Sequence, residues 1–185
     1  MHAQTVEQQP IAGDCFDVRR AADQFDRHTG ASQHRAEIAP DGARAHARKN
    51  AHGVDLNRNF PYRWRGGLPH SDGYYPGPEP ASEPETRAVI DFVRQIKPQI
   101  SIWYHQPWGA VLACHGRPAL AARYAKLVRM RTSCRGNGLR GTVISWENAE
   151  MPGTSAFVVE LPPGKIRARA ARRHAGAAVA VAEGA

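Results

Sequence analysis

This sequence of 185 residues has few cysteines and no long apolar run. Its three cysteines are Cys15, Cys114 and Cys134, and they form no pair at metal-ligand spacing and no disulfide framework. A disulfide bond between Cys114 and Cys134 is compatible with the sequence, which does not show whether it forms. No apolar stretch approaches the roughly 20 residues of a membrane span, so we expect none. No signal peptide is visible after Met1 either, which makes the cytoplasm the default expectation.

Acidic residues are also in deficit, and the chain has a formal net charge of +8. The excess of basic residues lies in residues 48–185, with five basic residues between 165 and 173. This pattern indicates either a module that binds nucleic acid or another acidic polymer, or an arginine-rich solvated surface. We favour the solvated surface and expect no nucleic-acid partner, because no nucleic-acid-binding motif accompanies the charge.

Three segments follow from composition and periodicity. Residues 1–38 show neither a helical nor a strand period, and we expect an irregular, disordered or non-native segment there. Residues 39–164 are expected to form the main domain, which includes an ordered surface loop rich in Pro, Gly, Tyr and Trp at 61–81. The alanine- and arginine-rich residues 165–185 are predicted to form a terminal helix.

Two helices are predicted inside the main domain. Ser82 and Glu85 have the spacing of a capping box, so a helix should start there, and Pro98 should stop it. A second helix is expected at about 118–130. Its buried side is expected to carry Leu120, Leu127 and Val128.

Two apolar runs read as buried strands, and each ends at a residue that can carry chemistry. The run that starts at Ile100 ends at His105, and the run that starts at Ala156 ends at Glu160. Helices that alternate with such strands predict an α/β fold with a mixed, largely parallel sheet and flanking helices. Because ligands bind at the carboxyl ends of strands in these sheets, His105 and Glu160 are candidate site residues.

Each candidate also has an ordinary structural interpretation. Arg58, between Asn57 and Asn59, could receive a carboxylate through its guanidinium group, or these residues could simply form a turn. His105 could ligate a metal or form a hydrogen bond in the core. Glu160 must be paired, metal-bound or shifted in pKa if it is buried, and otherwise it is an exposed residue at a strand end.

Taken together, the polar segments resemble those of the zinc carboxypeptidase family, and most closely its bacterial branch that includes murein peptide amidases. The resemblance covers about two-thirds of the chain, with its motifs in the family's order. These motifs are Pro40–Gly42, Arg48–Asn50, Gly53–Pro61, Ser82–Thr86, His105–Pro107 and Pro152–Pro162. It implies a carboxypeptidase-like fold and a peptide substrate with a free carboxylate.

The resemblance also implies a role for each matching residue. Arg48 would stabilise the oxyanion, and Asn57 and Arg58 would hold the substrate's carboxylate. His105 would be the third ligand of a Zn²⁺ ion. Glu160 would be the general base that takes a proton from water.

The sequence departs from the family where the other two zinc ligands should stand. The family places them in a His-x-x-Glu motif well upstream of the region of Arg48. His34 and Glu37 have that spacing, but they lie too close to Arg48 for the helix and strand that should intervene. We therefore expect a truncated or mis-started chain, incomplete on its N-terminal side, and assign neither residue as a ligand. There is also no tyrosine between Tyr124 and Glu160 to serve as a proton donor.

Two functions remain in competition. The first is a zinc-dependent hydrolase of metallocarboxypeptidase type that cleaves a peptide or amide bond beside a free carboxylate, with cell-wall peptides as candidate substrates. The second is a truncated or inactive family member that binds carboxylate ligands without zinc or turnover. The two missing ligands leave the enzymatic activity of this chain as the open question.

Overall fold

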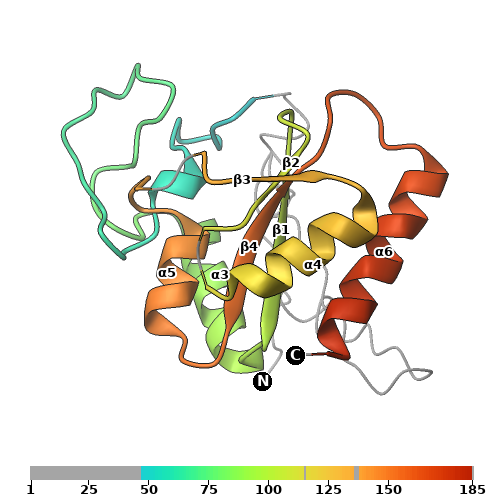
Figure 1. Ribbon diagram of the computed structural model, residues 1–185. Helices are drawn as coiled ribbons and strands as arrows, with labels where there is room; N and C mark the ends of the chain where they lie inside the picture. Colours follow the sequence, from blue (N-terminus) through green and yellow to red (C-terminus); the bar gives the residue numbers. More distant parts are fainter. Residues whose placement is uncertain (1–46, 115, 136–137, 185) are drawn as a thin grey trace, which may run out of the picture. The chain divides into compact units, whose positions relative to one another are not determined.

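The computed structural model describes residues 47–114, 116–135 and 138–184 (Figure 1). They form two compact units. The first contains residues 47–60 and 64–92, and the second contains residues 61–63 and 93–184. The expectations for residues 1–38, including those for His34 and Glu37, lie outside the described residues.

The first unit is built from loops that close on a short 3-10 helix, η1 (Leu56–Arg58). The buried Asn59 follows η1 and fastens the long loop after it. Its amide nitrogen donates to the carbonyl oxygens of Pro76 and Glu79, at 2.8 and 3.1 Å, and to the Ser82 hydroxyl at 2.9 Å. A single buried amide therefore fixes the far end of the loop at 61–81.

Helix α3 (Pro84–Ile96) continues from this loop, and its start differs from the expectation. The first helical bond runs from Arg87 N to Glu83 O, so Glu83 precedes the first turn and Ser82 does not cap it. The Ser82 hydroxyl instead bonds Asn59 and Glu83, because the buried polar groups of the loop compete for it. The helix ends at Ile96, before Pro98, as predicted.

The second unit is organised around a four-stranded sheet with the order β1-β4-β2-β3. Its strands are β1 (Ile100–His105), β2 (Ala110–Leu112), β3 (Arg131–Ser133) and β4 (Ser155–Glu160). The pairs β1–β4 and β2–β3 are parallel, and β2–β4 is antiparallel. The predicted α/β class with a mixed, largely parallel sheet is confirmed, as are the strand ends at His105 and Glu160.

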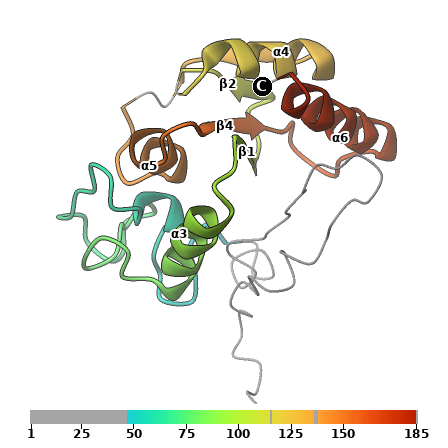
Figure 2. The same cartoon turned by 90° about the horizontal axis from the view of Figure 1, so that it is seen from below.

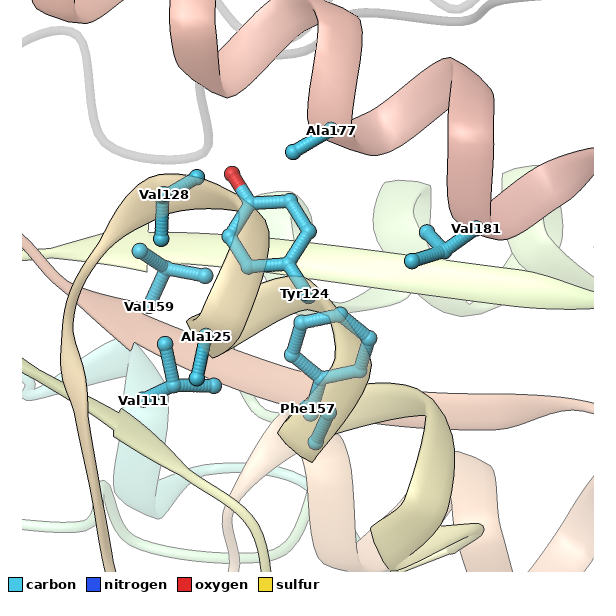
Figure 3. Close-up of a cluster of buried hydrophobic side chains, with 9 residues drawn as sticks. Val111, Tyr124, Ala125, Val128, Phe157, Val159, Ala177 and Val181 are labelled. Atoms are coloured by element: carbon cyan, nitrogen blue, oxygen red, sulfur yellow. The ribbon is translucent and has the colours of Figure 1, made fainter.

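Three helices pack around this sheet: α4 (Pro118–Val128), α5 (Val143–Glu150) and α6 (Ala168–Ala182). Helices α4 and α6 cover the face that carries Phe157 and Val159, where Tyr124, Ala177 and Val181 complete a fully or almost fully buried core (Figure 3). Helix α5 lies on the other side of the strands (Figure 2). The predicted terminal helix is thus part of the core of this unit.

One predicted core residue is wrong. Leu127 is 42% exposed, whereas Leu120 and Val128 are buried as expected. The buried stripe of α4 runs through Ala121, Tyr124 and Val128, and Leu127 lies outside it.

A disulfide bond links Cys114 and Cys134, with their Cα atoms 5.3 Å apart. The two cysteines follow the parallel strands β2 and β3, so the bond joins the carboxyl ends of that pair. In the part of the chain that the structure describes, no helix is long and apolar enough to cross a membrane.

Candidate functional site

Arg48 and Asp55 form the first element of the candidate site, within the first unit. The Nε and Nη2 atoms of Arg48 lie 2.8 and 2.7 Å from Asp55 Oδ2. The other carboxylate oxygen of Asp55 accepts from the backbone nitrogen of Asn57 at 3.1 Å. Asp55 is almost completely buried while the Arg48 side chain is 49% exposed. The buried carboxylate therefore holds a guanidinium group that still reaches solvent.

Arg58 lies beside the same group of residues. Its Nη1 atom donates to the backbone oxygen of Asn57 at 2.6 Å. Its guanidinium carbon is 5.3 Å from the ring centre of Tyr74, and that of Arg48 is 4.6 Å from the same ring. Both cations therefore share one aromatic ring, an arrangement that stabilises positive charge.

The electrostatics of this group favour an anionic ligand. Burial lowers the pKa of Arg58 most, and the positive charge of Arg48 lowers it further, while Asp55 and Tyr74 raise it. An arginine stays charged under all ordinary conditions, so the consequence is an unbalanced charge. Among the described residues, the two guanidinium groups lie near one carboxylate, that of Asp55, and a ligand carboxylate would restore the balance through charge-assisted hydrogen bonds.

His105 and Glu160 form the second element, within the second unit. They are the last residues of the adjacent parallel strands β1 and β4 and lie directly opposite each other in the register. His105 Nδ1 is 3.6 Å from Glu160 Oε1, beyond the length of a hydrogen bond. The imidazole and the carboxylate therefore approach each other closely without closing a direct bond.

Glu160 has an unusual surrounding for a carboxylate. Its side chain is 8% exposed, and its Oε2 atom is buried with no hydrogen-bond partner among the described residues. A buried carboxylate oxygen without a partner is costly, and it calls for an explanation such as a catalytic role or a bound water or ion. Of the two interpretations that the sequence left open, the structure shows the buried one, and the role of Glu160 stays a prediction.

The described residues do not by themselves fit a zinc ion. A catalytic zinc needs three protein ligands and an open position. Among residues 47–114, 116–135 and 138–184, no group of three or more His, Cys, Asp or Glu side chains could hold a metal. His105 is the single described residue to which the family resemblance gives a ligand role, and one imidazole does not make a zinc site.

The structure therefore groups the predicted site residues in two sets. Asn57 and Arg58 lie with Arg48 around Asp55, and His105 lies with Glu160, each set within its own unit. Their roles stay predictions.

Sequence reasoning missed Tyr74, which supplies the ring under both arginines. The glycine- and aromatic-rich loop was visible, but no local pattern shows which of its aromatic side chains a distant arginine will contact.

The second unit is an α/β unit with an acid and an imidazole at the carboxyl ends of neighbouring strands. In open α/β sheets this edge is where ligands generally bind. Comparison with known proteins defines the class further. The chain belongs to the zinc carboxypeptidase family, whose sequence profile matches residues 27–119, half of the chain. The matched range includes Arg48, Asn57, Arg58 and His105, whereas Glu160 lies beyond it.

Two relatives show the extent of the similarity. Murein peptide amidase A of Escherichia coli is 39% identical over 88 residues, which cover 42% of this chain and 35% of the amidase. The chain thus spans about a third of the length of this relative. A metallocarboxypeptidase A-like protein of Trichophyton verrucosum is 44% identical over 46 residues, 23% of this chain and 11% of that protein.

Solved structures agree with this assignment. The crystal structure of a murein-tripeptide amidase from Escherichia coli superposes with a TM-score of 0.60 at 26% identity, over 79% of this chain and 64% of that one. Carboxypeptidase A of Helicoverpa armigera gives a TM-score of 0.66 at 15% identity, over 86% and 54% of the two chains. The second similarity concerns the fold alone.

Proposed function

We propose that this protein is a peptidase-type hydrolase that cleaves a peptide or amide bond beside a free carboxylate, with cell-wall peptides as its substrate class. The observation that carries the proposal is the pair formed by Glu160 and His105. A buried carboxylate, one of whose oxygens has no hydrogen-bond partner among the residues that the structure describes, faces an imidazole at the strand ends of a chain that belongs to a peptidase family. In this proposal Glu160 accepts the proton of the attacking water.

The arginine group supports the substrate side of the proposal. Arg58 and Asn57 would bind the free carboxylate of the substrate, and Arg48 would stabilise the negative charge that develops on the scissile carbonyl oxygen. The supporting observation is that Arg48 and Arg58 share the ring of Tyr74 and, within the part of the chain that the structure describes, lie near one carboxylate, that of Asp55. The family relatives named as murein peptide amidases favour peptides of the cell wall as the source of such a carboxylate.

The family uses zinc, and this requirement decides between the leading proposal and a second one. Because the described residues do not form a zinc site, we assign no step to a metal. The same observation favours the second candidate, a family member that binds carboxylate-bearing peptides through Arg58 without turnover. That candidate predicts no bound zinc and no hydrolysis, with ligand binding intact.

The experiment measures zinc content, hydrolysis of a muropeptide-type tripeptide and binding of the same peptide by calorimetry. The full chain is compared with two variants, Glu160→Gln and Glu150→Gln. The first removes the proposed base, and the second is a control that changes an exposed glutamate of the same unit.

The leading proposal expects stoichiometric zinc and hydrolysis that the Glu160→Gln variant loses while the Glu150→Gln variant keeps it. A folded wild-type protein that holds no zinc and hydrolyses nothing, yet binds the peptide, would support the second candidate. A protein that shows no hydrolysis and no binding of the peptide would overturn both candidates.

A further inference from the structure

Glu147 is a fully buried carboxyl group that the proposed reaction does not use. It lies on α5 and is held by two side chains of β1. The hydroxyl of Ser101 donates to its Oε1 atom at 2.5 Å, and the indole Nε1 of Trp103 donates to its Oε2 atom at 2.6 Å. Both oxygens of the carboxyl group are thus hydrogen-bonded by one strand, which offsets part of the cost of burying the group.

The face of β1 that Glu147 holds is the face that carries the candidate site. Side chains alternate along a strand, so Ser101, Trp103 and His105 point to one side, and Ile100 and Ile102 point to the other, where they pack against the core. His105 follows Trp103 on that face at a rise of about 7 Å.

Strand β4 shows the same division. Phe157 and Val159 belong to the core cluster with α4 and α6, so Glu160 lies on the opposite face, across from His105 in the register. Glu147, Trp103 and the pair of His105 and Glu160 are therefore successive features of a single face of the sheet.

We propose that Glu147 is a positioning residue, whose carboxyl group holds β1 through Ser101 and Trp103 and thereby keeps His105 in place beside Glu160. The functional meaning of that placement rests on the proposed function, but the placement itself can be measured without it. A carboxyl group suits this role because it offers two acceptors to two donors of one strand, spaced as every second residue.

Because the carboxyl group of Glu147 gains or loses a proton near neutral pH, the strength with which it holds β1 should depend on pH. Burial raises the pKa of Glu147 to about 7, although the hydrogen bonds from Ser101 and Trp103 oppose the shift. Near neutral pH the group therefore exists in both forms, and the ionised form makes the stronger hydrogen bonds.

Other charged groups face this region from the neighbouring elements. Arg94 of α3 and Glu150 of α5 lie 3.7 Å apart, and Arg94 also lies over the ring of Trp146. His105 of β1 and Glu160 of β4 lie at the ends of their strands. None of them is among the causes of the shift, which are burial and the two hydrogen bonds.

The first test follows the indole N–H resonance of Trp103 by NMR from pH 5 to pH 9. The chain has 4 tryptophans, and the Trp103→Phe variant assigns the signal. We expect the Trp103 signal to move with a midpoint near pH 7 in the wild-type protein and in Glu150→Gln, and to stay constant in Glu147→Gln. Movement that persists in the Glu147→Gln variant would show that another group controls Trp103 and would overturn the proposal.

The second test measures hydrogen exchange at the backbone bond between Leu161 N and His105 O, which is 2.7 Å long. The reference is the bond from Ala113 N to Ser133 O at the β2–β3 pair. We expect Glu147→Ala to accelerate exchange at Leu161 about tenfold more than at Ala113, and Glu147→Gln, which can keep both hydrogen bonds, to restore the wild-type ratio. Equal acceleration at both amides would mean general destabilisation and would refute a positioning role.

The two tests remain decisive if the Glu147→Ala variant fails to fold, because the Glu147→Gln variant and the wild-type protein can be compared over the same pH range. The exchange ratio between Leu161 and Ala113 should then follow pH in the wild-type protein and not in the variant. If the wild-type protein has no hydrolytic activity, the proposed function is refuted, but the Trp103 resonance and the exchange ratio still test the positioning role. If the enzyme is active but the Trp103 resonance and the exchange ratio do not change with pH, only the positioning role is refuted.

Discussion

Replacing Glu147 with glutamine should change how the stability of this protein depends on pH. Glutamine has the shape of the protonated carboxyl group, and it can accept from Trp103 and donate to Ser101. The folded protein raises the pKa of Glu147 to about 7, from an ordinary value of 4.5. Between these two values the folded state holds a proton that the unfolded chain releases, so this group makes the free energy of unfolding fall as the pH rises.

The size of the effect follows from the shift. About 2.5 pKa units at 1.36 kcal/mol per unit correspond to roughly 3 kcal/mol, which is lost between about pH 4.5 and pH 7. Such a value is a large share of the 5–15 kcal/mol that typically stabilises a folded protein. For a chain of this size it corresponds to a difference in melting temperature of roughly 10 °C.

Urea unfolding of the wild-type protein and of Glu147→Gln, at pH values from 4.5 to 8.5, measures the effect. Other titrating groups act on both proteins alike, so the difference between the two curves isolates Glu147. We expect similar stabilities near pH 4.5 and a variant that is about 3 kcal/mol more stable above pH 7.5. A constant difference across the range would show that burial does not shift this group, and a less stable variant at high pH would show that the ionised form is favoured.

Three further changes test other parts of the structure. Replacing Cys114 and Cys134 with serine should lower the free energy of unfolding by about 3 kcal/mol, measured in urea without reductant, because the bond closes a loop of 20 residues; an unchanged midpoint would contradict this. Tyr124→Phe should cost about 1–3 kcal/mol, since its buried hydroxyl bonds His174 Nδ1 at 2.8 Å, and a thermal melt equal to that of the wild-type protein would refute the assignment. Arg58→Lys should weaken binding of a peptide carboxylate about tenfold by calorimetry, because an ammonium cannot make the paired bonds of a guanidinium, and equal affinity would exclude Arg58 from the binding site.

The ends of the two long strands could be predicted from the sequence, because a run of apolar residues stops at a polar one. That reasoning located His105 and Glu160 correctly at strand ends. It could not show that the two strands are neighbours, since the register of β1 and β4 is a long-range property of the sheet. The sequence alone therefore could not predict that the carboxylate of Glu160 lies close to the imidazole of His105.

Short elements escaped prediction for a related reason. Strands β2 and β3 have three residues each, too few to show a period. Helix α5 buries Trp146 and Glu147 side by side, so it lacks the polar face that marks a surface helix.

The capping prediction at Ser82 failed although its local pattern was sound. The buried amide of Asn59, distant in the sequence, occupies the hydroxyl that would have served as the cap. Local propensity was overruled there by a tertiary contact.

The parallel ladder of β1 and β4 also sets a rule for how this chain can change length. Removing one residue at the start of β4 would move the side chains after it to the opposite face of the sheet. Phe157 would then leave the core, and Glu160 would face away from His105. Extra residues in the exposed turn around Gly153, just before the strand, would leave that pairing intact. Within β4, a change in length by an odd number of residues moves side chains to the wrong face of the sheet, whereas the turn before the strand tolerates such changes. A library that varies the length of this region should therefore place its insertions and deletions in the turn and leave the strand unchanged.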